Sequence, residues 1–273
     1  MATFATSEQL LVIIDPAARQ TDGESVRIAK DVLSAGAAAK MCLPDDPEEF
    51  ARALSRRGSR RPVVIGDDHA LLRAVTQLYR ERELAGCGLS VVPVGEASLA
   101  ESLGVPCGAV AAARAVLDGT ERRLDLLVDD SDGVVLTELA IPPARRHVPE
   151  RLSAAPWYRS LVRTLNPRPV RLAAVPSPGP ARLRVEVDGE TLVDLAHPVE
   201  AVTVIPTTSG TAAVEVRPLS VGAEATPLRA SGHTVTVTGP DFRYRADAAV
   251  SGPVRKRTWR VMEGAWGLVL PSA

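Results

Sequence analysis

The stretch that decides the fold is Val63-Val64-Ile65-Gly66-Asp67-Asp68-His69-Ala70-Leu71-Leu72. Its β-branched run fits a central strand of a parallel sheet, where both faces are covered and polar/apolar alternation is lost. The apolar residues from Leu71 to Leu78 recur at helical spacing, so we expect a helix directly after the strand. In open α/β sheets, ligands sit beyond the carboxyl ends of the strands, and the first turn of a helix offers unpaired N–H groups to anions. Chemistry is therefore expected first at residues 66–70.

Strands and helices alternate through the first half of the chain. Apolar runs that end at Asp, Pro or Gly predict strands at 10–14, 38–43, 63–66, 88–95 and 124–128. Amphipathic spacing and capping signals predict helices at 25–33, from 47 onward, 71–78, 98–103 and 108–117. Asp15-Pro16, directly behind the first strand, is interpreted as a turn. This order predicts a doubly wound α/β domain with a parallel sheet, at residues 1–138.

The pattern changes near Pro142. Prolines become frequent, and helical periodicity is confined to a short predicted helix at 157–165. The remaining apolar runs are short and alternating, which predicts strands at 182–187, 191–195, 202–205, 212–216, 234–237 and 242–244. Asp188-Gly189-Glu190 fits a hairpin turn between two of them. We therefore predict an antiparallel β-sandwich domain at residues 139–259.

Composition excludes several classes of protein. The net charge is −1, from 32 basic and 33 acidic residues, and aromatic residues make up 3% of the chain, so a nucleic-acid partner is not expected. The three cysteines are far apart, which gives no zinc motif and no disulfide framework. No apolar run approaches the ~20 residues that span a bilayer, and the N-terminus has no secretion signal. We expect a cytoplasmic protein without a transmembrane segment.

Two basic stretches leave alternatives open. The loop 56–61 contains four arginines in six residues, and a solvated surface loop is favoured there over a phosphate or lipid-headgroup patch. The run 255–257 is interpreted in the same way, as a solvated strand end rather than a site that faces a headgroup.

Several motifs together resemble one family. The motifs are Asp15-Pro16 after the first strand, residues 66–71 after the third, Val92–Gly95 followed by 100–106, and Leu117-Asp118-Gly119. Their order and spacing are similar to those of the diacylglycerol kinase catalytic domain, a family that includes bacterial lipid kinases and sphingosine kinases. Asp247-Ala248-Ala249 and the segments 259–262 and 268–271 resemble the end of that domain, so the resemblance covers nearly the whole chain. It implies ATP and Mg²⁺ bound between an α/β domain and a β-sandwich, with segment 260–273 returning to the first domain.

The resemblance also implies which residues form the site. The nucleotide-binding positions would be Asp15, Gly66, Asp67, Asp68, His69, Gly95 and Glu96. Asp68 would also belong to the magnesium network, and Asp247 would be the general base for the attacking lipid hydroxyl. The family pattern Gly-Gly-Asp-Gly-Thr is here Gly66-Asp67-Asp68-His69-Ala70, and the Asp-Gly-Glu of the acid–base group is Asp247-Ala248-Ala249.

These departures separate three hypotheses. Each lost preorganised donor costs roughly 10²–10³ in rate, so several altered loops favour a degenerate kinase that acts as a ligand-binding or regulatory protein. The first alternative is an active lipid kinase acting on diacylglycerol or a related lipid hydroxyl. The second is a dimeric scaffold that uses the sandwich edges. A lipid or nucleotide ligand, peripheral membrane contact and a homodimer all remain open.

Overall fold

The computed structural model describes residues 9–143, 181–219 and 226–272. The strands of the first range are β1 (Gln9–Ile14), β2 (Ala38–Cys42), β3 (Arg61–Gly66), β4 (Gly88–Pro93), β5 (Thr120–Asp129), β6 (Val134–Val135) and β7 (Leu139–Ile141). Its helices are α1 (Pro16–Thr21), α2 (Gly23–Gly36), α3 (Pro47–Ser55), α4 (Asp68–Arg80), α5 (Ser98–Ser102) and α6 (Ala109–Asp118), with a 3-10 turn η1 (Leu84–Gly86). The later strands are β8 (Arg184–Val187), β9 (Glu190–Val193), β10 (Val199–Pro206), β11 (Ala212–Pro218), β12 (Leu228–Gly232), β13 (Thr234–Ala246) and β14 (Ala249–Leu270).

The N-terminal half is a parallel sheet in the order β2-β1-β3-β4. Successive residues of β1 point to opposite faces, and each face is covered by helices. Leu10, Val12 and Ile14 pack with residues of α2 and α6, whereas Leu11 and Ile13 pack with residues of α3 and α4. The expected parallel sheet is thus confirmed for four strands, which have the continuous apolar sequences of a sheet covered on both sides. The strand predicted at 124–128 does not join them, because β5 pairs antiparallel with β14 and β6.

The predicted turn at Asp15-Pro16 is wrong, because these residues begin α1. The Asp15 carboxylate accepts a hydrogen bond from the Ala17 N–H at 2.9 Å, and Pro16 occupies the first helical position. An N-terminal cap followed by proline is a strong helix-start signal. The helix is only six residues long, too short for apolar periodicity to reveal it.

The C-terminal half is rich in strands, as expected. β7, β10, β11 and β12 form an antiparallel series, and β13 pairs with β7, β8 and β14. Alternate residues of these strands enclose a second core, which includes Val202, Val214, Val235 and Trp259. The hairpin turn predicted at Asp188-Gly189 is confirmed between β8 and β9. The helix predicted at 157–165 lies outside the described residues.

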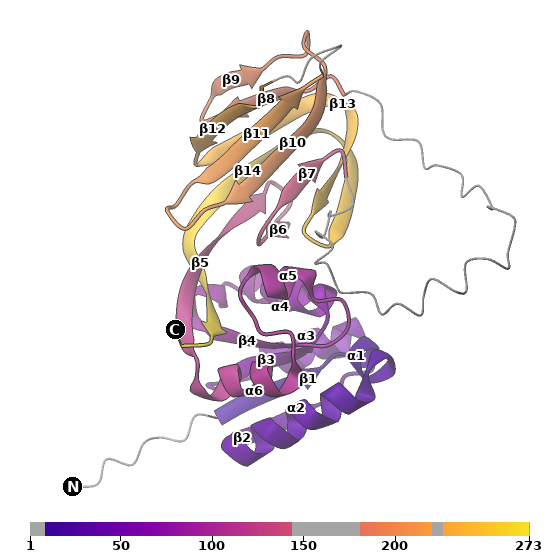
Figure 1. Ribbon diagram of the computed structural model, residues 1–273, viewed down its shortest axis with the longest axis vertical. Helices are drawn as coiled ribbons and strands as arrows, with labels where there is room; N and C mark the ends of the chain where they lie inside the picture. Colours follow the sequence, from indigo (N-terminus) through magenta and orange to yellow (C-terminus); the bar gives the residue numbers. More distant parts are fainter. Residues whose placement is uncertain (1–8, 144–180, 220–225, 273) are drawn as a thin grey trace, which may run out of the picture.

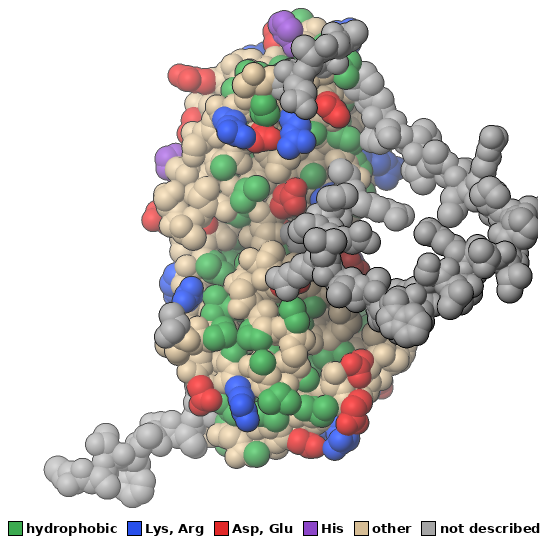
Figure 2. Space-filling model, viewed as in Figure 1, with side chains coloured by type: hydrophobic (Ala, Val, Ile, Leu, Met, Phe, Trp, Pro, Cys, Tyr) green, Lys and Arg blue, Asp and Glu red, His purple; other side chains and the backbone are tan. Residues whose placement is uncertain are grey.

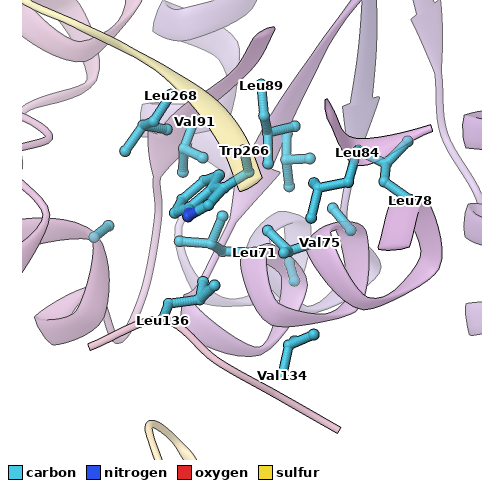
Figure 3. Packing of buried hydrophobic residues seen from close by; sticks show 14 of the residues in the cluster. Leu71, Val75, Leu78, Leu84, Leu89, Val91, Val134, Leu136, Trp266 and Leu268 are labelled. Atoms are coloured by element: carbon cyan, nitrogen blue, oxygen red, sulfur yellow. The ribbon is translucent and has the colours of Figure 1, made fainter. Parts of the chain in front are cut away.

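Except for Pro271, the segments 259–262 and 268–271, which resemble the end of the family's domain, belong to one strand of 22 residues, β14. It pairs first with β13, then with β5, and finally in parallel with β4, so it runs through both halves of the molecule (Figure 1). Its Trp266 is fully buried in the core of the N-terminal half, close to Leu71 and Leu136 (Figure 3). The two halves therefore share one continuous sheet.

A buried carboxylate holds the irregular part of β14. The register with β5 shifts between Met262 and Trp266. There the Asp125 carboxylate accepts hydrogen bonds from the N–H groups of Gly264 and Gly210, both at 2.8 Å. The β10–β11 turn is thereby tied to the strand that connects the halves. Within the described ranges, no helix is both long enough and apolar enough to cross a membrane.

Candidate functional site

A pocket lies where the two halves meet, beyond the ends of β3 and β4. Its volume is about 590 Å³. The N-terminal half contributes the start of α4 and the segment around α5, and the C-terminal half contributes the β13–β14 turn. The lining residues are Asp68, His69, Glu96, Ala97, Ser98, Leu99, Glu101, Arg245, Asp247 and Ala248. We call this pocket the cleft.

Asp68 binds the start of α5. Its side chain is 2% exposed and accepts hydrogen bonds from the N–H groups of Leu99 (2.8 Å) and Ala100 (3.1 Å) and from Ser98 Oγ (3.0 Å). In return, the Asp68 N–H donates to the carbonyl of Glu96 at 2.9 Å. Asp68 thus joins the loops after β3 and β4, and both of its carboxylate oxygens already have donors.

Asp67 occupies the anion-binding end of α4. Its carboxylate accepts a hydrogen bond from the Ala70 N–H at 2.9 Å, which makes it the N-cap of this helix. We expected the start of this helix to offer unpaired N–H groups to an anion. Two of these groups are already paired, because the Ala70 N–H donates to the Asp67 carboxylate and the Asp68 N–H donates to the Glu96 carbonyl, so the expectation is wrong for both. A glycine in place of Asp67, as in the family pattern, would leave the Ala70 donor available to a phosphate.

Gly66 is needed for close packing at the end of β3. A Cβ atom on Gly66 would lie 2.6 Å from Cβ of Ala70 and 3.1 Å from Cβ of Asp15. The Asp15 carboxylate is buried and accepts a hydrogen bond from Arg73 Nη1 at 2.6 Å. The Arg73 guanidinium also lies 5.4 Å from the ring centroid of Phe50. The ends of β1 and β3 are thus locked together behind the cleft rather than inside it.

Asp247 holds the opposite wall of the cleft. It is 2% exposed and occupies the two-residue turn between β13 and β14, with a φ of 50°. Its carboxylate accepts hydrogen bonds from the N–H groups of Leu136 (2.6 Å), Thr137 (2.9 Å) and Glu138 (3.0 Å), and from Thr137 Oγ1 (2.6 Å). The carboxylate therefore anchors the segment between β6 and β7. A general base needs a lone pair directed at its substrate, and here four donors surround the two oxygens.

Charge in the cleft is mostly negative among the lining residues. Asp68 and Asp247 are buried, whereas Glu96, Glu101 and His69 are exposed. Arg245 is the basic residue in this lining, and its side chain is 11% exposed. It donates a hydrogen bond to the Asp247 carbonyl at 3.0 Å and lies 4.0 Å from Glu138. The exposed side chains at the cleft are thus those of Glu96, Glu101 and His69, while the two aspartates are turned toward the fold.

The residues present do not fit a magnesium site based on Asp68. Within the described part of the chain, no three His, Cys, Asp or Glu residues gather closely enough to hold a metal ion. The Asp68 oxygens point to the N–H groups of α5, and a cation there would compete with three hydrogen bonds. Hard cations such as Mg²⁺ need several oxygen ligands with accessible lone pairs.

The structure brings half of the expected site residues together. Asp68, His69, Glu96 and Asp247 line the cleft, whereas Asp15, Gly66, Asp67 and Gly95 are not among its lining residues. Gly95, with a φ of 96°, lies against Asp67, since a Cβ there would be 3.6 Å from Cβ of Asp67. None of these contacts tests binding, so their roles stay predictions.

Sequence reasoning missed three groups. Arg245 lies two positions before Asp247, and strand alternation could have placed both on one side. Ser98 and Glu101 lie just after the expected loop and could have been included in it. The pairing of Arg73 with Asp15 spans 58 residues and has no local signal.

The surface around these elements carries no single-sign field on the face shown in Figure 2. Where described side chains are visible there, red acidic groups and blue basic groups are interspersed. Long-range steering of a charged partner requires a surface dominated by one sign. Recognition on this face therefore depends on local contacts.

Comparisons with known proteins complete the description of the site. No protein-family model and no curated protein sequence matches the chain. Among solved structures it is similar to "a putative diacylglycerol kinase from Bacillus anthracis str. Sterne", with a TM-score of 0.70, 15% identity, and 97% of this chain and 98% of that chain covered. A second structure, described as a diacylglycerol kinase from the same strain, gives a TM-score of 0.69 at 13% identity, with 97% and 98% covered. At this identity the similarity establishes the fold, and the chain has the diacylglycerol-kinase-like fold over nearly its whole length.

Proposed function

We propose that this chain is a lipid-kinase-like protein that binds a lipid or nucleotide ligand in the cleft and acts as a ligand-binding or regulatory protein, with ATP-dependent phosphotransfer weakened or lost. In this proposal residues 1–138 are the doubly wound, nucleotide-binding-like domain, segment 260–273 returns to it, and residues 139–259 are the β-sandwich that closes the cleft. The support from comparison is the shared fold.

The main support for this proposal is that the two buried carboxylates of the cleft are fully engaged in hydrogen bonds within the fold. Asp68 accepts three hydrogen bonds and Asp247 accepts four, all from this chain. Every oxygen of these two carboxylates already accepts at least one hydrogen bond from a loop or helix start of this chain, so their lone pairs are directed at the fold. Phosphoryl transfer depends on positioning and on electrostatic stabilisation, and these groups instead stabilise loops.

The loop of α4 adds independent support. A polyphosphate is usually bound by N–H groups at a glycine-rich helix start. In this chain Asp67 places its own carboxylate on the Ala70 N–H, where a phosphate oxygen would be bound. At about 4 Å, two negative charges repel by about 4 kcal/mol at an effective dielectric constant of 20.

An active kinase is the second candidate, because two carboxylates of the family pattern line one cleft. Asp68, from the loop after β3, and Asp247, from the β13–β14 turn, line the same cleft from opposite walls. A ligand that rearranged the segment between β6 and β7 would expose Asp247 to a lipid hydroxyl. Hydrogen bonds at catalytic groups can change when substrate binds.

The deciding experiment measures binding and turnover on the same preparation. Thermal shift and calorimetry with ATP and MgCl₂ report nucleotide binding, and radiolabelled ATP with diacylglycerol vesicles reports transfer. Binding of nucleotide or lipid without transfer supports the proposal. Transfer that disappears in a folded Asp247→Asn variant would overturn it in favour of the active kinase.

A restoration variant tests the loop argument directly. Asp67→Gly/His69→Gly returns the loop to the family's glycine pattern and releases the Ala70 N–H. We expect ATP to bind at least tenfold more tightly to this variant than to the natural chain. Asp132→Gly is the matched control, because it removes one exposed loop carboxylate at a φ of 60° that glycine adopts easily. Equal effects of both variants would show that net charge alone is responsible.

A further inference from the structure

The arginine-rich loop 56–61 is mostly a set of structural anchors. Arg57 is buried, forms an ion pair with Glu83 and donates to the Leu54 carbonyl. Arg61 Nη2 donates to the Val116 carbonyl at 2.6 Å, and Arg60 Nη1 lies 3.5 Å from the Arg57 carbonyl. Arg56 is different: it is exposed, and within the described residues its side chain makes no hydrogen bond or ion pair.

Arg56 lines a second pocket, between β2 and α3, which we call the groove. Its volume is about 340 Å³, and it shares no residue with the cleft. β2 is the last strand of the parallel sheet (Figure 1). Because the groove is lined by residues of β2, it lies at the sheet edge. The lining residues are Leu11, Lys40, Cys42, Leu43, Pro44, Glu49, Arg52, Ala53 and Arg56.

The groove has an apolar side and a cationic side. Leu11, Pro44 and Ala53 are buried or half-buried, and Leu43 is 49% exposed although it is apolar. From α3, the groove receives Arg52 and Arg56, which lie one turn apart on one helix face. From β2 it receives Lys40, which pairs in register with Leu11 and so shares its side of the sheet.

Most nearby carboxylates are already engaged. Glu49 accepts a hydrogen bond from the Asp45 N–H at 3.0 Å and lies 3.7 Å from Arg52. Asp46 caps α3 through the Glu49 N–H, and Asp45 forms an ion pair with Arg19. Among the described residues, Lys40 has no side-chain hydrogen bond or ion pair either. Two cations without described partners therefore border a pocket whose lining is mixed, with apolar side chains beside charged ones.

We propose that the groove is a binding site for a small anionic amphiphile, a carboxylate or phosphate monoester joined to a short apolar body. The anionic head would contact Lys40 and Arg56, and the apolar body would cover Leu43 and Ala53. A volume of about 340 Å³ lies within the range of small-molecule pockets, in which a few polar groups fix the orientation of a mostly apolar ligand. This site is separate from the cleft and does not depend on the proposed function.

Octyl phosphate, used below its critical micelle concentration, is a suitable probe. Calorimetry on the full chain measures its binding. We expect one molar equivalent to bind at least tenfold more tightly than inorganic phosphate or the neutral octyl glucoside. The same affinity is expected with saturating ATP present, because the two pockets share no residue. Binding of inorganic phosphate as tightly as octyl phosphate, or displacement by ATP, would overturn the proposal.

Charge reversal identifies the site. Lys40→Glu/Arg56→Glu should lower the affinity for octyl phosphate at least tenfold. Arg80→Glu/Arg114→Glu is the control, because it changes the net charge equally at exposed positions of α4 and α6. This control should leave the affinity for octyl phosphate within twofold. If the reversed variant does not fold, Lys40→Gln/Arg56→Gln carries the test, with circular dichroism as the check. Equal loss in both pairs of variants would refute the assignment to the groove. Binding only to vesicles of an anionic phospholipid, and not to monomeric octyl phosphate, would also refute it.

Discussion

The cleft and the groove differ in how their charged side chains are compensated. In the cleft, the two buried aspartates accept seven hydrogen bonds from this chain, three at Asp68 and four at Asp247. In the groove, Lys40 and Arg56 are exposed and have no described partners. A buried charge must be compensated within the fold, whereas an exposed one is compensated by water until a ligand arrives. Charged residues in a pocket are thus evidence for binding only after their existing partners are known.

Asp247→Ala should have the largest effect on stability. The substitution leaves the N–H groups of residues 136–138 without their acceptor, so we expect a loss of about 3 kcal/mol in the free energy of unfolding. Urea denaturation at pH 7 measures it. Asp241→Ala is the control, because that carboxylate is exposed and pairs only with exposed Arg255; it should cost less than about 0.5 kcal/mol. Similar losses in the two variants would show that Asp247 is not an anchor.

Asp68→Ala should come second, with a loss of about 2 kcal/mol. Two N–H groups at the start of α5 and the Ser98 hydroxyl lose their acceptor, but water from the cleft can reach part of this region. Hydrogen exchange gives a local readout, since the amides of Leu99 and Ala100 should exchange at least tenfold faster. Unchanged protection of these amides would contradict the hydrogen bonds that define this wall of the cleft.

Asp67→Ala should cost about 1 kcal/mol, the usual effect of removing an N-cap. The same denaturation experiment measures it. Asp67→Ser retains a capping oxygen and should recover most of the loss. If Asp67→Ala lost more unfolding free energy than Asp68→Ala, Asp67 would be more than a helix cap, and this assignment of the two aspartates would be wrong.

Lys40→Gln/Arg56→Gln should change stability by less than about 0.5 kcal/mol, because neither side chain has a partner among the described residues. Thermal and urea unfolding without ligand provide the measurement. With octyl phosphate present, the natural chain should gain stability that the variant does not. A large loss in the ligand-free variant would show that these cations stabilise the fold, which would remove the contrast between the two pockets.

Much of the N-terminal half could be predicted from the sequence, because its strands are continuous apolar runs and its helices carry strong caps. Asp68, His69, Glu96 and Asp247 were expected near one another and do line one cleft. Their partners could not be predicted, since Asp247 binds residues about 110 positions away and Asp68 binds residues about 30 positions away. A capping carboxylate and a catalytic one are the same residue type, and only the direction of the surrounding N–H groups distinguishes them.

Elements formed by long-range pairing were also missed. β14 contains glycines and a proline that look like turns, yet its neighbours β13, β5 and β4 supply the hydrogen bonds that keep it extended. The six-residue α1 depends on its cap. In both cases the local sequence is weak, and the deciding interactions come from the rest of the fold.

The path of β14 has a consequence for how the chain folds during synthesis. Trp266 and Leu268 belong to the core of the N-terminal half, and β4 receives its outer neighbour from the same strand, about 180 residues later. The ribosome must therefore deliver the chain through residue 268 before the first half can bury its apolar residues completely. Until then, one edge of β4 remains open to pairing with other chains. Pairing over so long a sequence separation favours slow folding.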